Sequence, residues 1–334
     1  MIARDAKAKY MDLARENLLN KENLIMAENM KRDWTAADIP SQKGRSVVIT
    51  GTGGIGYETA LEMTRAGAEV IIAGRNKGKG EEAIRQIKEL TSGGNIRFEK
   101  LDLADLASIK AFGERIKAQH KSLDILINNA AVMNPPQRKV TKDGFELQIG
   151  TNYLGHFALT AHLFPLLQKC NKPRVVTMSS IAHRQGIINF ADLQSEVNYK
   201  PMVAYSQSKL ACLMFALELQ RRSDAAGWGI SSMAAHPGIS RTELIPNGAG
   251  KNSPAGIARR LFGPIFFQPA AHGAWPSLYA ATAKEATGGI YYGPSRMNEM
   301  RGYPALAQIA PQAKDIEVAS KLWEESERLT NVKF

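Results

Sequence analysis

The sequence predicts a doubly wound α/β fold, in which helices cover both faces of one parallel sheet. Short apolar runs rich in β-branched residues alternate with segments of helical character along most of the chain, which is the pattern of successive βαβ units. A glycine-rich stretch directly follows the first of these runs, and in such folds ligands bind at the carboxyl ends of the strands. The 334 residues are 44% hydrophobic and 22% charged, as in soluble globular proteins.

The elements can be placed in chain order. Residues 1–40 are expected to form an N-terminal helical extension, because Asp5–Met30 sets apolar side chains among Lys, Arg and Glu at helical spacing. Residues 41–334 are expected to form a single domain, with one helix covering Tyr205–Leu219. The alternation stops at Leu244–Trp275, where Gly, Pro and an apolar cluster predict an inserted substrate lid. The six predicted strands are Ser46–Ile49, Val70–Ala73, Ile96–Leu101, Leu123–Ile127, Val175–Met178 and Ile230–Ala234.

The charge balance restricts the partners of the chain. There are 43 Lys and Arg against 32 Asp and Glu, a formal net charge of +11, and such a surface attracts anions. Nucleic acid is not expected, because no run of five basic residues occurs and the aromatic residues, 7% of the chain, do not interleave with basic ones. A phosphorylated cofactor and a lipid headgroup remain as candidate anions.

Targeting signals and cysteine chemistry give a second set of expectations. Met1–Trp34 carries a charge every three or four positions, which predicts neither a signal peptide nor a membrane span. Cys170 and Cys212 fit neither a disulfide framework nor a metal-ligand spacing. We therefore expect a cytoplasmic protein with reduced thiols, no membrane span and no metal site.

The glycine-rich stretch is a candidate phosphate loop. Thr50–Gly56 reads Thr-Gly-Thr-Gly-Gly-Ile-Gly and leads into a helix expected to begin near Tyr57. Glycines let the backbone approach a pyrophosphate, and the amides of a helix N-terminus hold it. A structural turn uses glycine too, but the position directly after the first buried strand favours a dinucleotide site.

The end of the second predicted strand indicates which dinucleotide binds. An acidic residue there would receive the ribose 2′-hydroxyl of NAD, whereas the 2′-phosphate of NADP needs a cation. The strand ends in Ala-Gly-Arg75-Asn, with Lys77 and Lys79 following. Because a guanidinium can stack on adenine and bind phosphate with two donors, we expect NADP(H), although a solvated loop arginine is the alternative.

Polar side chains that follow later strands form a candidate catalytic group. Tyr205 and Lys209 lie four apart in a predicted helix and so share one face. An ammonium group near a phenol favours the phenolate, which makes a tyrosine an effective general acid or base. Ser179 and Ser180 follow the fifth strand, where a hydroxyl can bind a substrate oxygen, and Asn152 lies in the helix after the fourth. Each alone is more often a cap or turn residue, but together they converge on one sheet edge.

With these residues in place, the sequence resembles the short-chain dehydrogenase/reductase family, most closely the branch of retinol dehydrogenases, WW-domain oxidoreductases and protochlorophyllide reductases. The similarity extends from about Trp34 to Phe334, some nine-tenths of the chain. The resemblance implies a fold of the Rossmann type. The motifs that carry the resemblance, in the family's order, are the glycine loop, Asp102-Leu103, Asn128-Asn129-Ala130, Asn152, Ser180, Tyr205-x-x-x-Lys209, and Pro237-Gly238 with Thr242.

The resemblance implies a role for each matched residue. Tyr205 would be the acid/base and Ser180 would hydrogen-bond the substrate oxygen. Lys209 would hold the nicotinamide ribose and favour the phenolate of Tyr205, and Asn152 would support a water that connects Lys209 to solvent. On the cofactor, Asp102 would face adenine, Asn129 would lie on the adenosine side and Thr242 would bind the carboxamide, and the further implied cofactor contacts are Gly51, Gly53, Gly54, Ile55, Gly56, Leu103, Ala130, Pro237 and Gly238.

The sequence departs from the family pattern in three places. The glycine loop is one residue shorter than usual, so which of its glycines touches phosphate is open, and Ala131 replaces the usual Gly after Asn-Asn-Ala. Ser180 and Tyr205 are 25 positions apart because of an insert, Arg184–Val203, that matches the retinol dehydrogenase branch and in which Asp192 is expected to cap a loop.

The function predicted on these grounds is that of an NADP(H)-dependent ketoreductase acting on the carbonyl or alcohol group of a hydrophobic small molecule. The same site could instead reduce an activated C=C bond, or the chain could be a non-catalytic module that senses NADP(H). A membrane-surface protein using the basic charge and Phe266-Phe267 is a further alternative. A homodimer and a monomer are both compatible with such a fold.

Overall fold

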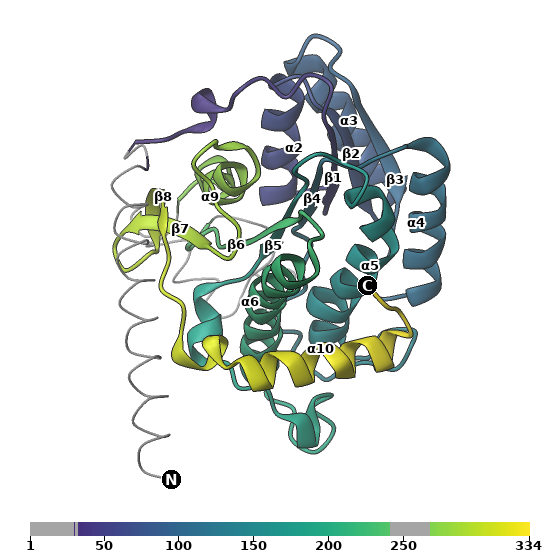
Figure 1. Ribbon diagram of the computed structural model, residues 1–334, viewed down its shortest axis with the longest axis vertical. Coiled ribbons are helices and arrows are strands. Elements are labelled where there is room, and N and C mark those ends of the chain that lie inside the picture. Colours follow the sequence, from purple (N-terminus) through teal and green to yellow (C-terminus); the bar gives the residue numbers. More distant parts are fainter. Residues whose placement is uncertain (1–29, 31–32, 241–267) are drawn as a thin grey trace.

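The computed structural model describes Met30, residues 33–240 and residues 268–334. Its centre is an eight-stranded sheet of order β3-β2-β1-β4-β5-β6-β7-β8, seen nearly edge-on in Figure 1. Neighbouring strands pair in parallel except for β7 and β8, which pair antiparallel. The strands are β1 Ser46–Thr50, β2 Glu69–Gly74, β3 Ile96–Lys100, β4 Ile125–Asn128, β5 Arg174–Met178, β6 Ser231–Ala235, β7 Tyr291–Arg296 and β8 Arg301–Leu306.

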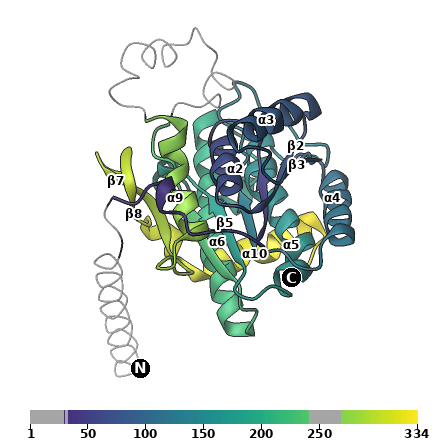
Figure 2. The same ribbon diagram turned by 90° about the horizontal axis from the view of Figure 1, so that it is seen from above.

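Helices cover both faces of this sheet, as Figure 2 shows from above. One core lies between the sheet and α2, α3 and α9, and the other lies between the sheet and α4, α5, α6 and α10. Alternate residues of each strand enter the two cores: Val48 and Ile71 belong to one, and Val47 and Val70 to the other. The helices are α2 Ile55–Arg65, α3 Lys77–Leu90, α4 Leu106–Gln119, α5 Gly155–Leu167, α6 Pro201–Ala226, α9 Ala270–Thr282 and α10 Ile316–Thr330.

The C-terminal helix α10 crosses the outer side of α5 and α6 (Figure 1). Trp323 from this helix and Phe334 beyond it meet Phe157 of α5, with ring centroids 5.0 Å and 5.1 Å away. Phe215 of α6 stacks on Trp323 at 5.8 Å. Edge and stacked contacts of this kind stabilise the packing beyond what the buried area of the rings contributes. This aromatic cluster therefore fixes α5 against α6, the helix that carries Tyr205 and Lys209.

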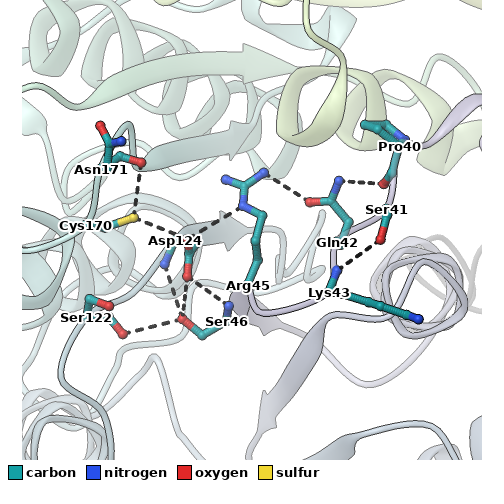
Figure 3. A network of polar contacts seen from close by, with 10 residues as sticks. All are labelled: Pro40, Ser41, Gln42, Lys43, Arg45, Ser46, Ser122, Asp124, Cys170 and Asn171. Carbon is teal, nitrogen blue, oxygen red and sulfur yellow. Dashed lines mark hydrogen bonds and ion pairs between the residues drawn. The ribbon is translucent and has the colours of Figure 1, made fainter.

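The edge of the sheet at which β1 and β4 begin is held by Asp124 (Figure 3). Its carboxylate accepts hydrogen bonds from the Ser46 amide at 2.9 Å and the Ser46 hydroxyl at 3.1 Å. Arg45 lies 3.6 Å away as an ion pair, and the Cys170 thiol donates to the second oxygen at 3.3 Å. Burial, with the hydrogen bond to Asp124, raises the pKa of Cys170 to about 11, which favours the protonated thiol at neutral pH.

The predicted fold class and all six predicted strands are confirmed, with bounds that differ by one or two residues. Three expectations need correction. The sheet is not wholly parallel, because β7 and β8 add an antiparallel pair at one edge. The helix after the glycine loop begins at Ile55, not near Tyr57. The predicted lid extends too far, since Ala270–Trp275 opens α9, which packs on the sheet.

The rest of the predicted lid, 241–267, and most of the predicted N-terminal extension, 1–29 with 31–32, lie outside the described residues. The described part of the extension packs on the core: Trp34 is 3% exposed and meets Tyr279 of α9 edge-on at 5.4 Å. No helix within the described residues is both long and apolar enough to cross a membrane.

Candidate active site

The glycine loop between β1 and α2 is packed tightly against itself. A Cβ at Gly56 would lie 2.3 Å from the Gly51 carbonyl oxygen, and Gly51 and Gly54 have left-handed φ angles of +96° and +54°. A side chain at any of these three positions would clash or strain the backbone. At Gly53, by contrast, a Cβ would meet nothing within 4 Å. Gly53 is therefore the glycine at which the loop has open space beside it, next to the N-terminus of α2.

Thr50 and Asn129 fix the base of this loop. The Thr50 hydroxyl accepts the amide protons of Asn129 and Ala130, both at 2.9 Å, which ties the end of β1 to the end of β4. The Asn129 side chain donates to the Thr50 carbonyl at 2.7 Å. These strands are neighbours at the point where the strand order reverses, which is where doubly wound folds bind ligands.

A cavity of about 290 Å³ adjoins the loop, lined by Thr52, Gly53, Tyr57 and the first turns of α3, including Lys79. Arg75 and Lys79 are exposed and, among the described residues, neither forms an ion pair, whereas Lys77 pairs with Glu81 at 3.5 Å. Two of the three predicted cations are thus available to an anion beside the loop.

The expected catalytic pair lies in the middle of α6. Tyr205 is 4% exposed and Lys209 is 3% exposed, with the Lys209 ammonium 5.9 Å from the centre of the Tyr205 ring. Lys209 Nζ donates to the Met178 carbonyl at 3.1 Å, and Ser179 Oγ donates to the Lys209 carbonyl at 2.8 Å. The carboxyl end of β5 is thereby joined to the helix turn that carries both residues.

Ser180 follows directly and begins the short helix η3, Ile181–Gln185. Its side chain accepts the Ala182 amide proton at 3.2 Å, and its carbonyl accepts from His183 Nδ1 at 2.7 Å. At the other end of η3, a Cβ on Gly186 would lie 2.5 Å from the Ser206 carbonyl. This close approach of backbone to backbone brings the Ser180 turn against the part of α6 next to Tyr205.

Asn152 lies in a stretch of π-helix, Ile149–Leu154, that leads into α5. Such widened turns are frequent at functional sites. Its amide group exchanges two hydrogen bonds with the Val132 backbone, at 2.7 Å and 2.9 Å, and donates to Ser208 Oγ at 3.0 Å. Asn152 therefore joins the segment after β4 to α6 between Tyr205 and Lys209. The water that the resemblance implies for Asn152 stays a prediction.

The loop after β6 contains Pro237 and Gly238 and is held by residues that the sequence reasoning missed. Gly238 has a φ of +60°, and a Cβ there would lie 2.3 Å from the Met300 carbonyl. The Gln268 side chain donates to the Pro237 carbonyl at 2.8 Å. His236 Nε2 meets Glu299 at 3.0 Å, and Arg184 pairs with the same carboxylate at 2.7 Å.

Glu299 thus joins the Pro237 loop to the segment after Ser180. Burial would raise the pKa of Glu299, but the hydrogen bonds from His236 and the Gln308 amide and the charge of Arg184 outweigh it and hold the pKa below its usual range. Burial also lowers the pKa of His236. These contacts give His236 a structural role in holding the Pro237 loop.

The remaining predicted residues fall into three groups. Asp102 and Leu103 lie after β3, where Asp102 caps its own turn by accepting the Ala104 amide proton at 3.0 Å. Asp192 caps the insert as expected, accepting the Glu196 amide proton at 2.6 Å. Thr242 and Phe266-Phe267 lie outside the described residues. Within the described ranges, no group of three or more His, Cys, Asp or Glu side chains could hold a metal ion.

Comparisons with known proteins agree with this geometry. A model of the short chain dehydrogenase family matches residues 45–249. Polyprenol dehydrogenase of Mus musculus is 38% identical over 312 residues, which cover 91% of this chain and 89% of the relative. Retinol dehydrogenase 12 of Homo sapiens is 41% identical over 294 residues, 87% of this chain and 88% of the relative.

Solved structures are similar as well. A Mycobacterium paratuberculosis protein, 42% identical, superposes with a TM-score of 0.75 and covers 90% of this chain and 99% of its own. The RhlG/NADP active-site complex of Pseudomonas aeruginosa superposes with a TM-score of 0.60 over 75% of this chain and 94% of its own, and at 22% identity it is similar in fold alone.

Proposed function

The chain belongs to the short-chain dehydrogenase family, and we propose that it is an NADP(H)-dependent oxidoreductase acting on the carbonyl or alcohol group of a hydrophobic substrate. The observation that carries this proposal is the meeting of three elements at one sheet edge: the glycine loop, the Ser180 turn, and the α6 turn with Tyr205 and Lys209. A nicotinamide cofactor supplies or accepts the hydride when it is bound.

The glycine loop fits a dinucleotide. Its closest contacts are within the protein, at Gly51 and Gly56, while Gly53 faces open space in front of the α2 amides. A loop shaped in this way leaves room for a pyrophosphate at the helix N-terminus, where the exposed amides favour an anion. Asp102, Asn129 and the Pro237-Gly238 turn lie after other strands of the same sheet, so they can contact the two ends of an extended cofactor.

Tyr205 would move the proton at the substrate oxygen. The buried Lys209 ammonium lies 5.9 Å from the centre of the phenol ring, on the same face of α6. Ser180 carries the hydroxyl that would hydrogen-bond the same substrate oxygen, and the Gly186 contact keeps its turn against α6. Lys209 is held by the Met178 carbonyl, which positions its ammonium group before any ligand arrives.

The cations after β2 support NADP(H) as the cofactor. Arg75 is exposed at the end of β2, and Lys79 lines the cavity that the glycine loop also lines. A 2′-phosphate at this position would meet two positive charges, whereas the segment offers no carboxylate directly after the strand for a 2′-hydroxyl. We expect the wild type to prefer NADPH and Arg75→Asp to reverse that preference, and equal use of NADPH and NADH by the wild type would contradict the assignment.

The substrate class rests on the relatives and on the surface near the site. Polyprenol dehydrogenase and retinol dehydrogenase 12 are named for long apolar alcohols. In this chain Ile187, Met202 and Val203 are exposed apolar side chains that lie shortly after the Ser180 turn and at the start of α6. An apolar aldehyde, ketone or alcohol suits such surroundings.

The test is a screen for NADPH oxidation with apolar aldehydes and ketones, comparing the wild type with Tyr205→Phe. We expect turnover by the wild type and loss of turnover in Tyr205→Phe, with NADPH binding retained. Tyr279→Phe is the matched control, because Tyr279 is a buried tyrosine of α9 whose hydroxyl has no hydrogen-bond partner among the described residues. Unchanged turnover in Tyr205→Phe would rule out this residue as the acid.

A further inference from the structure

His156, the second residue of α5, has a position that the proposed reaction does not use. Its side chain is 2% exposed. Nε2 lies 2.9 Å from the Thr50 hydroxyl at the base of the glycine loop, and Nδ1 lies 2.8 Å from the Asn152 carbonyl. One ring therefore contacts both a residue that shapes the cofactor loop and a residue that joins the loop after β4 to the catalytic turn.

The hydrogen bonds around the ring determine its tautomer. Thr50 Oγ1 already accepts two amide protons, from Asn129 and Ala130, so its own proton is free to be donated to Nε2. The Asn152 carbonyl can only accept, which places the ring proton on Nδ1. Burial lowers the pKa of His156 to about 4, so the ring is neutral at pH 7 and carries this single proton.

The contacts continue from Asn152 into α6. Asn152 Nδ2 donates to Ser208 Oγ at 3.0 Å, and Ser208 Oγ donates to the Tyr205 carbonyl at 2.8 Å. The Asn152 carbonyl also accepts from the Cys212 thiol at 3.1 Å. A continuous set of hydrogen bonds thus extends from the glycine loop, through the imidazole ring, to the turn between Tyr205 and Lys209.

We propose that His156 is a positioning residue that couples the cofactor loop to the catalytic turn, with Nε2 holding Thr50 and Nδ1 holding Asn152. The proposal rests on the proposed function. It predicts that the two ring nitrogens have separable effects: the Thr50 contact acts on cofactor binding, and the Asn152 contact acts on turnover. A residue needed only for folding would show no such separation.

Two substitutions test this, because each keeps one half of the ring's contacts. In His156→Asn the amide nitrogen takes the place of Nδ1 and can donate to Asn152, but nothing reaches Thr50. In His156→Gln the longer amide reaches as far as Nε2 and can accept from Thr50, but loses Asn152. We expect His156→Asn to raise the KM for NADPH about tenfold with kcat within about twofold, and His156→Gln to lower kcat about tenfold with KM retained.

The matched controls are His162→Asn and His162→Gln, since His162 lies on the same helix but packs against Gly113 of α4. They should change neither constant. Thr50→Val removes the Nε2 contact together with the two amide hydrogen bonds at the base of the loop, so it should raise the NADPH KM at least as much as His156→Asn. The Thr50→Val measurement therefore still tests the proposal if one His156 variant fails to fold.

Equal losses in the two His156 variants, or no change in either, would overturn the coupling, as would an NADPH KM unchanged in Thr50→Val. The proposed function fails separately. If the wild type binds NADPH but turns over no carbonyl compound, the dissociation constants for NADPH still decide the role of His156: His156→Asn should bind about tenfold more weakly than His156→Gln, and equal constants would overturn it.

Discussion

Lowering the pH from 7 to 5 should destabilise the wild type more than His156→Asn. The folded protein holds His156 neutral, with a pKa that burial lowers from 6.5 to about 4, whereas the unfolded chain exposes an ordinary imidazole. Between these two values the unfolded state binds the additional proton. Stability from this group is therefore fully present above pH 6.5 and is lost as the pH falls toward 4.

The size of the effect follows from the two pKa values. At pH 5 the unfolded imidazole is almost fully protonated and the folded one is mostly neutral, so folding is disfavoured by about 2 kcal/mol relative to pH 7. His156→Asn replaces the group by one that does not titrate. The other buried histidines, including His183 and His236, are the same in both proteins and cancel in the comparison.

The assay is urea unfolding of both proteins at pH 7, 6 and 5, followed by a spectroscopic signal of the folded state. The stability difference between wild type and variant should shift by about 2 kcal/mol against the wild type from pH 7 to pH 5. Parallel pH dependences would refute the reasoning, because they would mean that His156 binds its proton equally in both states. Coincidence of two spectroscopic probes is the control for two-state unfolding.

Three further changes have expected outcomes. Gly56→Ala puts a methyl group 2.3 Å from the Gly51 carbonyl and should weaken NADPH binding more than tenfold in a fluorescence titration, a loss of at least about 1.4 kcal/mol of binding free energy. Unchanged affinity would contradict the packing described for the loop. Asp124→Ala leaves the Ser46 amide without its acceptor and the Ser46 hydroxyl with only the Ser122 carbonyl at 3.4 Å, and should cost about 2–4 kcal/mol of unfolding free energy, with kcat per folded molecule unchanged. Gly238→Ala forces a residue with a Cβ to a φ of +60° and should lower both the melting temperature and the affinity for NADPH, and a variant that matches the wild type in both would argue against strain at this turn.

Most of the strands that the sequence predicted are buried on both faces; β3, at the sheet edge, is the exception. Runs such as Val47-Val48-Ile49 are apolar at every position because both cores contact them. The last two strands have no such signal. Tyr291–Arg296 contains Gly293 and Pro294, and Arg301–Leu306 contains Gly302 and Pro304, residues that ordinarily mark turns and that strands tolerate near a sheet edge. The local sequence pattern therefore does not predict these two strands.

The residues of the site likewise divide into those that the sequence predicts and those that it does not. Ser180, Asn129 and the glycine loop could be predicted because each follows a recognisable strand, and strand ends meet at one edge. Glu299 and Gln268 could not, because they act on the Pro237 loop from a distance: His236 and Glu299 are 63 positions apart, and Glu299 lies in the hairpin turn that the sequence left unpredicted. Their roles depend on tertiary contacts that no periodicity encodes.

The neutrality of His156 is itself informative about the site. Lys209 is buried close enough that its charge contributes to lowering the pKa of His156. A protonated ring would place a second cation in the same layer as the Lys209 ammonium, and the two charges would repel each other. A neutral ring with one fixed proton joins Thr50 to Asn152 without that repulsion, and it needs no buried ion pair, whose desolvation would be costly. Order in this layer therefore comes from hydrogen bonds between uncharged groups, and under the proposed function the positive charge of Lys209 is left for the phenol and the cofactor.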